Sequence, residues 1–201
     1  TLPSVLDFLL IANKSALISE NSFGSVPLNA ITVFSSSEKI WHWAPSFSKN
    51  LYLSGPVERI HERVVVSPGF YLKENGVLVD DLLKDDQSLG IKTDKGWYMM
   101  SGCGHAGMMN TAHKFQQIEN KDVFGAIGGF HLFRSSEEDI SKTAKSLKKF
   151  GLRQLVGGHC TGIHAARTIA DIASISKENL SHGAIGTVVT KNLKIVRSSV
   201  E

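Results

Sequence analysis

Three segments of the sequence share one pattern, in which an apolar run ends in glycine and a histidine follows closely. The histidines are His105, His131 and His159. Glycine lets the backbone turn sharply and approach a ligand, and α/β sheets usually bind ligands in the loops after the carboxyl ends of their strands. Neutral imidazoles from separate strands can converge on one divalent cation. The three histidines together therefore predict a metal site.

Each of the two cysteines lies next to one of these histidines. Cys103 precedes His105 by two residues, and Cys160 directly follows His159. Thiolate ligation of zinc and nucleophilic catalysis with a histidine base are both open. We expect instead that both are small buried residues in tight turns, the commonest setting of a free cysteine. The other histidines are expected to be structural: His42, His61, His113, His164 and His182.

The glycines of the first segment also permit a different class of function. Gly102, Gly104 and Gly107 fit the GxGxxG pattern between a strand and a helix that binds dinucleotides. No acidic residue ends a following strand about twenty residues later, where the ribose contact belongs. A nucleotide-binding protein that uses the Gly102–Gly107 turn is therefore the alternative to metal binding.

Strands and helices alternate in the second half of the chain, which predicts an α/β layered fold. A helix is expected to begin at Ser135 with Glu138 or at Ser136 with Asp139, either pair making a capping box, and to stop at Gly151. The expected helices are 3–10, 106–118, 137–150 and 162–174, and the expected strands are 30–34, 51–53, 69–72, 77–79, 89–93, 97–100, 123–127, 153–156, 184–190 and 193–196.

The composition excludes several classes of protein. The chain has 201 residues, of which 42% are hydrophobic and 20% charged, enough for a core in one domain over 1–201. The net charge of +3 is too small and scattered to indicate a nucleic-acid partner. The apolar runs are too short to cross a bilayer. No secretion leader is recognised, and the two cysteines make no disulfide framework, so a cytoplasmic location is expected.

The segments 101–107, 128–132 and 158–162 resemble three signature segments of one branch of the metallo-β-lactamase fold, which includes archaeal dihydropterin–ribofuranosylaminobenzene 5′-phosphate synthases. The segment 86–96 resembles the strand pair that precedes them. The resemblance implies a four-layer αββα sandwich with one or two divalent metal ions, zinc first and manganese or iron next. It also implies that His105 and His159 are metal ligands and that His131 is a ligand or a substrate contact. Thr161 and Gly162 are expected to hold a phosphate or carboxylate at a helix start.

The HxHxDH loop of that superfamily is absent from this sequence. The chain therefore looks like the carboxyl-terminal part of such a domain, with the amino-terminal part missing. A metal-dependent hydrolase acting through a metal-activated water on a phosphorylated or pterin-like small molecule is expected, with a separate amino-terminal chain as a further partner. The alternative is a catalytically incomplete binding or structural module.

Overall fold

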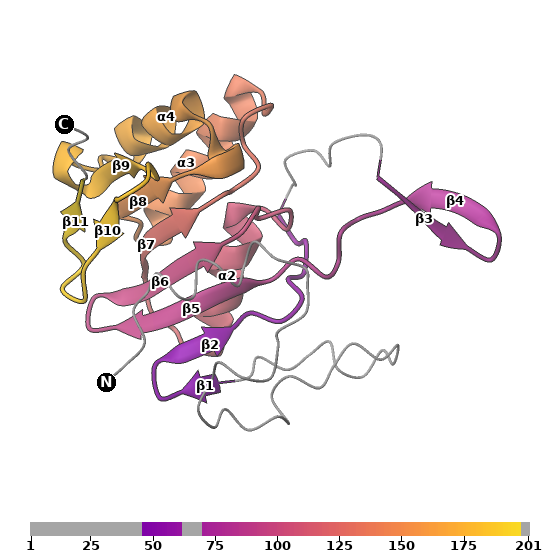
Figure 1. Cartoon of the computed structure of the whole chain (residues 1–201), viewed down its shortest axis with the longest axis horizontal. Coiled ribbons are helices and arrows are strands. Elements are labelled where there is room, and N and C mark those ends of the chain that lie inside the picture. The colour runs from indigo at the N-terminus through magenta and orange to yellow at the C-terminus, as the bar shows by residue number, and fades with distance from the viewer. Residues whose placement is uncertain (1–45, 62–69, 198–201) are drawn as a thin grey trace. The chain divides into compact units, whose positions relative to one another are not determined.

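A seven-stranded sheet forms the centre of the structure, a computed structural model that describes residues 46–61 and 70–197 (Figure 1). The expected helix 3–10 and strand 30–34 lie outside these residues. The strands follow the order β1-β2-β5-β6-β7-β8-β9 across the sheet. Their bounds are β1 Ser46–Ser48, β2 Leu51–Leu53, β5 Ser88–Thr93, β6 Gly96–Ser101, β7 Val123–Gly128, β8 Gln154–Gly157 and β9 Leu180–His182.

The sheet is antiparallel on one side and parallel on the other. β1, β2, β5 and β6 pair antiparallel, whereas β6 to β9 pair parallel in chain order. The chain passes from each parallel strand to the next through a helix. Because these right-handed crossovers all proceed in the same direction across the sheet, the helices lie on one face of it. The helices are α2 Met108–Ile118, α3 Glu137–Lys149 and α4 Ile163–Ala173, and α3 packs between the other two. None of the helices in the described part has the length and apolar content needed to cross a bilayer.

The main core lies between this sheet and its helices. Trp97 on β6 and Phe115 on α2 are fully buried, with ring centroids 5.3 Å apart. The indole Nε1 of Trp97 donates a hydrogen bond of 3.0 Å to the carbonyl of Glu119. Gly90 on β5 leaves room for the Phe115 ring, since an added Cβ would overlap it. Other large, fully buried side chains are Met99, Met108, Phe130, Leu132, Ile140, Leu147, Leu152, Leu155 and Ile169.

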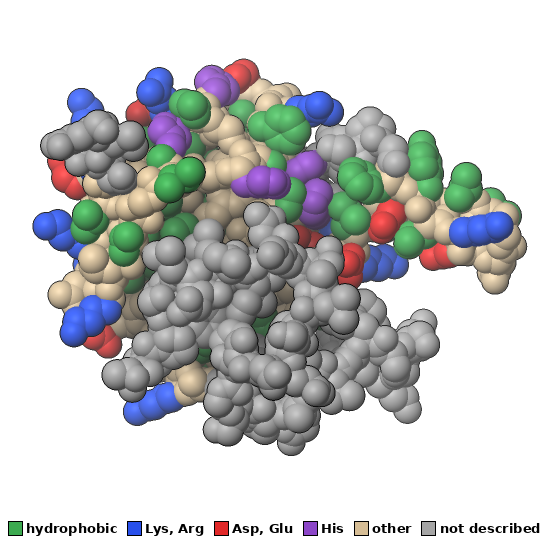
Figure 2. Space-filling model, in the orientation of Figure 1, with side chains coloured by type: hydrophobic (Ala, Val, Ile, Leu, Met, Phe, Trp, Pro, Cys, Tyr) green, Lys and Arg blue, Asp and Glu red, His purple; other side chains and the backbone are tan. Residues whose placement is uncertain are grey.

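Two small hairpins accompany the main sheet. β3 Tyr71–Glu74 and β4 Val77–Asp80 are joined at Asn75 and Gly76, whose positive φ angles of 50° and 86° are those of a tight hairpin turn. This hairpin exposes apolar side chains, which Figure 2 shows in green. The second hairpin pairs β10 Val188–Val189 with β11 Ile195–Val196.

The predicted α/β class is confirmed. The described residues supply one central sheet and its helices, and the second sheet of the expected sandwich is not among them. Three details of the prediction are wrong. The strand expected over 184–190 shrinks to Val188–Val189, and β1 and β9 are missing from the prediction because three residues carry too little periodicity. His182 therefore ends a strand, although it was expected to precede one.

Candidate metal centre

The loops that carry the predicted site start at one level of the sheet. Ser101 on β6 is the register partner of Gly128 on β7, and Gly128 is the partner of Gly157 on β8. Gly157 in turn pairs with His182 on β9. Because the carboxyl ends of these parallel strands are aligned, the residues two to four positions further on share one edge of the molecule.

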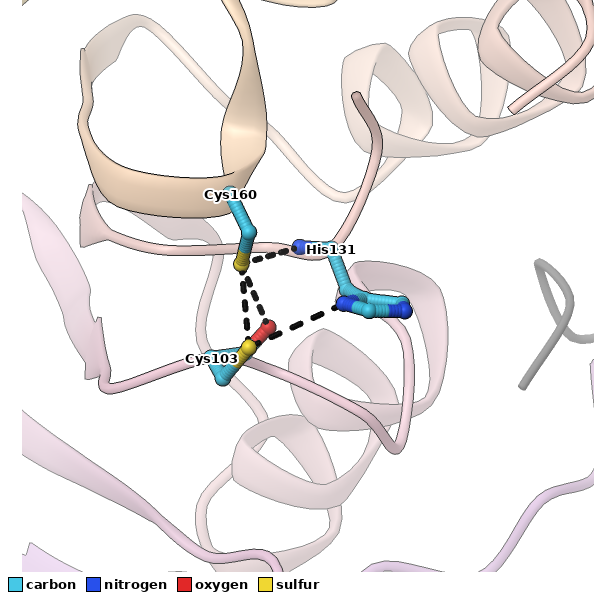
Figure 3. Close-up of side chains that lie close together, drawn as sticks. All are labelled: Cys103, His131 and Cys160. Carbon is cyan, nitrogen blue, oxygen red and sulfur yellow. Dashed lines mark hydrogen bonds between the residues drawn. The ribbon is translucent and has the colours of Figure 1, made fainter. Parts of the chain in front are cut away.

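Cys103, His131 and Cys160 come together at this edge, one from each loop (Figure 3). Their ligand atoms all lie within 4.8 Å of one another. The two sulfur atoms are 3.0 Å apart, and the Sγ atom of Cys103 is 3.7 Å from Nδ1 of His131. All three side chains are half-buried and point toward one another. Both cysteines lie in turns, as expected, but they are half-buried and next to His131 instead of fully buried.

Backbone hydrogen bonds hold Cys160 against the loop that follows β7. The amide of His131 donates to the Sγ atom of Cys160 at 3.1 Å. The amides of Leu132 and Phe133 donate to the Cys160 carbonyl at 2.9 and 3.1 Å. These bonds fix the sulfur relative to the imidazole, which is how outer-shell contacts orient metal ligands.

Backbone strain gathers at the same place. His131 and His159 have φ angles of 48° and 49°, a region that residues with a Cβ occupy at a cost. His159 begins η3, the short 3₁₀ helix His159–Thr161 that precedes α4. Strain of this kind persists where the surroundings enforce it and clusters at functional sites.

Two glycines make the close approach of the loops possible. A Cβ on Gly128 would overlap the carbonyl oxygen of Ser101, and one on Gly129 would overlap that of Gly102. The Gly129 Cβ would also lie 3.1 Å from both Sγ of Cys160 and Nδ1 of His159. Side chains at these positions would therefore force the loops apart.

The structure places the predicted ligands His105 and His159 around this cluster. The half-buried ring of His105 lies 4.4 Å from the ring of His131, centroid to centroid. His159 is exposed, with its Nδ1 beside Gly129. Histidine side chains gather on the face of the molecule shown in Figure 2. The roles of His105 and His159 as ligands stay predictions.

Thr161 and Gly162, the predicted anion contacts, lie at the start of α4. The Thr161 side chain is fully buried, and its hydroxyl donates to the carbonyl of Gly128 at 2.9 Å. Gly162 has a φ of 78° and is the residue from which α4 begins. The Thr161 hydroxyl thus stabilises the loop. The anion contact stays a prediction, and the backbone amides at the start of α4 are the groups that would make it.

The sequence did not single out Asp86 as a site residue. Its Oδ2 atom accepts a hydrogen bond of 3.1 Å from the amide of Ala106, next to His105. Burial, with smaller contributions from the neighbouring Cys160 and Asp86, raises the pKa of the Cys103 thiol to about 12. A thiol in this setting becomes a thiolate only when a cation lies beside it. The only signal for Asp86 was its position just before a buried strand.

The remaining described histidines have other contacts. The ring of His61 packs against those of His113 and Phe150. His164 is exposed on α4, with its Nε2 atom 2.6 Å from Oε1 of Glu137. His42 lies outside the described residues.

Comparison with known proteins identifies the fold. A solved structure of a metal-dependent hydrolase of the β-lactamase superfamily, Tm1679, matches with a TM-score of 0.60 and 29% identity. The match covers 66% of this chain and 51% of that one. The chain has the β-lactamase-superfamily fold. No protein-family profile matches it.

A curated relative agrees with the branch suggested by the sequence. The 7,8-dihydropterin-6-methyl-4-(β-D-ribofuranosyl)-aminobenzene-5′-phosphate synthase of Methanocaldococcus jannaschii is 36% identical over 129 residues. That match covers 64% of this chain and 44% of the synthase. The resemblance found in the sequence is therefore confirmed, and the chain spans about half the length of each protein that it matches.

The side chains at the edge of the sheet fit a metal ion. Two cysteine sulfurs and one imidazole nitrogen within 4.8 Å form a donor set typical of zinc. The fit rests on these three residues alone. It adds a ligand type, thiolate, that the histidine pattern did not require.

A cavity of about 550 Å³ lies beside α4 and β9. Its polar lining includes three cationic side chains and one acidic one, and Ala170, Ile175 and Leu180 line it with apolar groups. The lining residue His182 is the register partner of Gly157, two residues before His159. The charged residues are Arg167, Lys177, Arg197 and Asp171.

Proposed function

We propose that this chain carries part of the metal centre of a hydrolase, built from the loops that follow β6, β7 and β8. The observation that carries this proposal is the convergence of Cys103, His131 and Cys160 at one sheet edge. The proposed ligands also include His105 and His159. Similarity to a protein described as a metal-dependent hydrolase supports the assignment.

A metal ion bound at this edge would supply Lewis-acid polarisation of the substrate and an activated water. The protein contributes the positions of the donor groups. Gly128 and Gly129 let the loops approach, and the amide of His131 fixes the sulfur of Cys160. Zinc is the proposed ion because the donor set contains sulfur, with manganese and iron as the other ions that histidine accepts.

An anionic small molecule is the proposed substrate. The cavity beside β9 supports this choice, since Arg167, Lys177 and Arg197 outnumber Asp171 on its walls. Phosphate and carboxylate groups pair well with such cations. Ala170, Ile175 and Leu180 give the same cavity an apolar part, which supports a phosphorylated or pterin-like compound.

A separate amino-terminal chain is proposed as a partner, because the proteins that match are about twice as long as the matched region. A cytoplasmic location is proposed as well. Two cysteines make no disulfide framework, which supports a reducing compartment.

The test combines metal content with hydrolysis. The purified chain, alone and together with the proposed amino-terminal chain, is reconstituted with zinc, manganese or iron, dialysed, and assayed on chromogenic phosphoesters and carboxylic esters. We expect stoichiometric metal and metal-dependent turnover in the complete protein, a loss of both by at least tenfold in His159→Ala, and no turnover by this chain alone. The matched control is His164→Ala, an exposed histidine of α4. Bound metal without any turnover in the complete protein would leave a binding module and contradict the hydrolase.

The synthase relative supports a second candidate function. It is 36% identical to this chain over 129 residues, and the match covers 44% of that protein. We propose synthesis of a ribofuranosyl-aminobenzene phosphate as the alternative reaction. An assay with the phosphorylated and pterin substrates of that reaction distinguishes it from simple ester hydrolysis.

A further inference from the structure

We propose that Cys103, His131 and Cys160 bind one thiophilic divalent cation through two thiolates and one imidazole. This inference rests on the proposed function, because it names the ligands and the class of metal at the same edge. It differs from the histidine-only site that the spacing of His105 and His159 suggests. The difference matters, since thiolates select zinc-type ions over magnesium, calcium and manganese.

The donor atoms lie close enough to one another to bind a single ion. Around one tetrahedral zinc, with bonds of about 2.3 Å to sulfur and about 2.0 Å to nitrogen, neighbouring ligand atoms lie roughly 3.5 Å apart. The Cys103 Sγ atom and the His131 Nδ1 atom are 3.7 Å apart. The two sulfurs, at 3.0 Å, must separate slightly to bind the same ion.

The backbone prepares one of the two sulfurs to carry a negative charge. The amide of His131 donates to Sγ of Cys160 at 3.1 Å. Amide donors to sulfur stabilise the thiolate form and recur at metal–thiolate sites. The left-handed backbone of His131, with a φ of 48°, directs the amide of this residue to one sulfur and its imidazole to the other. One residue thus organises all three ligands.

The sites of the ligands in the fold also favour an ion. Each ligand comes from a different loop, and 57 residues separate the two cysteines. An ion bonded to all three ligands would hold the three loops in a fixed geometry at the ends of β6, β7 and β8. The glycines at 128 and 129 remove the side chains that would otherwise prevent this approach.

A disulfide between Cys103 and Cys160 is the competing use of the same pair. It would form one S–S bond and release two protons and two electrons to an oxidant such as a peroxide. The half-buried position and the free state of both cysteines are compatible with it. Oxidation would remove two of the three proposed ligands, so the experiment is carried out with a phosphine reductant and without oxygen.

The experiment is a titration of the reduced chain with cobalt(II), a spectroscopic substitute for zinc. We expect one equivalent to produce an intense near-ultraviolet thiolate-to-cobalt charge-transfer band, displaced by zinc. Cys103→Ser and Cys160→Ser should each lose at least half of this band. His131→Ala should weaken cobalt binding by at least tenfold. The control His164→Ala should behave as the unmodified chain does.

A second measurement uses the unmodified chain, so that the test does not depend on variants that fold poorly. One equivalent of cadmium should protect both cysteines from alkylation by iodoacetamide, so that the mass of the chain measured by mass spectrometry does not increase. Cobalt bound without the charge-transfer band, or cysteines that stay reactive with bound cadmium, would overturn the thiolate site and leave the proposed function standing. A chain that binds neither ion would overturn both.

Discussion

Cys160 is the residue through which the loops after β7 and β8 are joined. Its sulfur accepts the amide of His131, and its carbonyl accepts the amides of Leu132 and Phe133. Its sulfur also lies 3.0 Å from that of Cys103 in the loop after β6. A residue with so many contacts contributes to the site whether or not it ligates a metal.

The residue types of the site could be predicted from the sequence, but the set that converges could not. Glycine followed by histidine located all three loops correctly. The directions of the side chains depend on the left-handed backbones of His131 and His159, which spacing does not reveal. The sequence predicts turns for Cys103 and Cys160 and no more, because a lone cysteine carries no metal-ligand spacing.

A buried hydroxyl allows a prediction at the same scale. Tyr98 on β6 is 3% exposed, and its hydroxyl has no hydrogen-bond partner among the described residues. An unpaired buried hydroxyl costs about 1–3 kcal/mol. Tyr98→Phe is therefore expected to raise the free energy of unfolding at pH 7 by about 1 kcal/mol, measured by urea denaturation.

The pH dependence of that variant provides the control. Burial raises the pKa of the Tyr98 phenol above its ordinary value of 10.0. Above pH 10 the unfolded chain releases this proton and the folded chain retains it, so the stability of the unmodified protein falls. The advantage of Tyr98→Phe should then grow between pH 10 and 11. Equal stability of both proteins across this range would contradict the burial of the phenol.

At the scale of elements, α3 shows how local sequence fixes a helix. Its apolar residues recur at helical spacing, acidic residues occupy its first turn and Lys148 and Lys149 its last. The prediction over 137–150 agrees with the observed Glu137–Lys149. β9 shows the opposite case, because its three residues become a strand only by pairing with β8. Short elements of this kind depend on tertiary contacts and not on a local pattern.

The N-cap of α3 decides between the two capping pairs that the sequence left open. The Ser136 hydroxyl oxygen accepts the amide of Asp139 at 3.1 Å, whereas that of Ser135 has no partner among the described residues. Ser136→Ala should lower the free energy of unfolding by about 1 kcal/mol, measured by thermal or urea denaturation. Ser135→Ala, the matched control, should leave it unchanged or slightly higher. A larger loss of stability in Ser135→Ala than in Ser136→Ala would show that Ser135, and not Ser136, caps the helix.

At the scale of the molecule, the arrangement of the sheet explains why the site lies where it does. β6, β7 and β8 are parallel neighbours whose carboxyl ends are aligned in register. Their crossover helices cover one face and leave the loops at one edge. The alternation of strands and helices in the sequence predicts parallel strands with loops at one edge. It does not predict that β1 and β9 complete the two sides of the sheet.

The matching proteins share only part of their length with this chain. The match covers about two thirds of this chain and about half of each known protein. In this chain the fold places donor groups from three loops together. The proposed metal centre therefore depends on the sheet as a whole and not on any single motif.

The most direct test of the metal centre is X-ray absorption at the zinc edge of the reconstituted chain after dialysis. We expect sulfur neighbours at about 2.3 Å together with nitrogen at about 2.0 Å. Zinc surrounded only by nitrogen and oxygen would contradict the thiolate ligands. A chain that retains no zinc would contradict the metal centre itself.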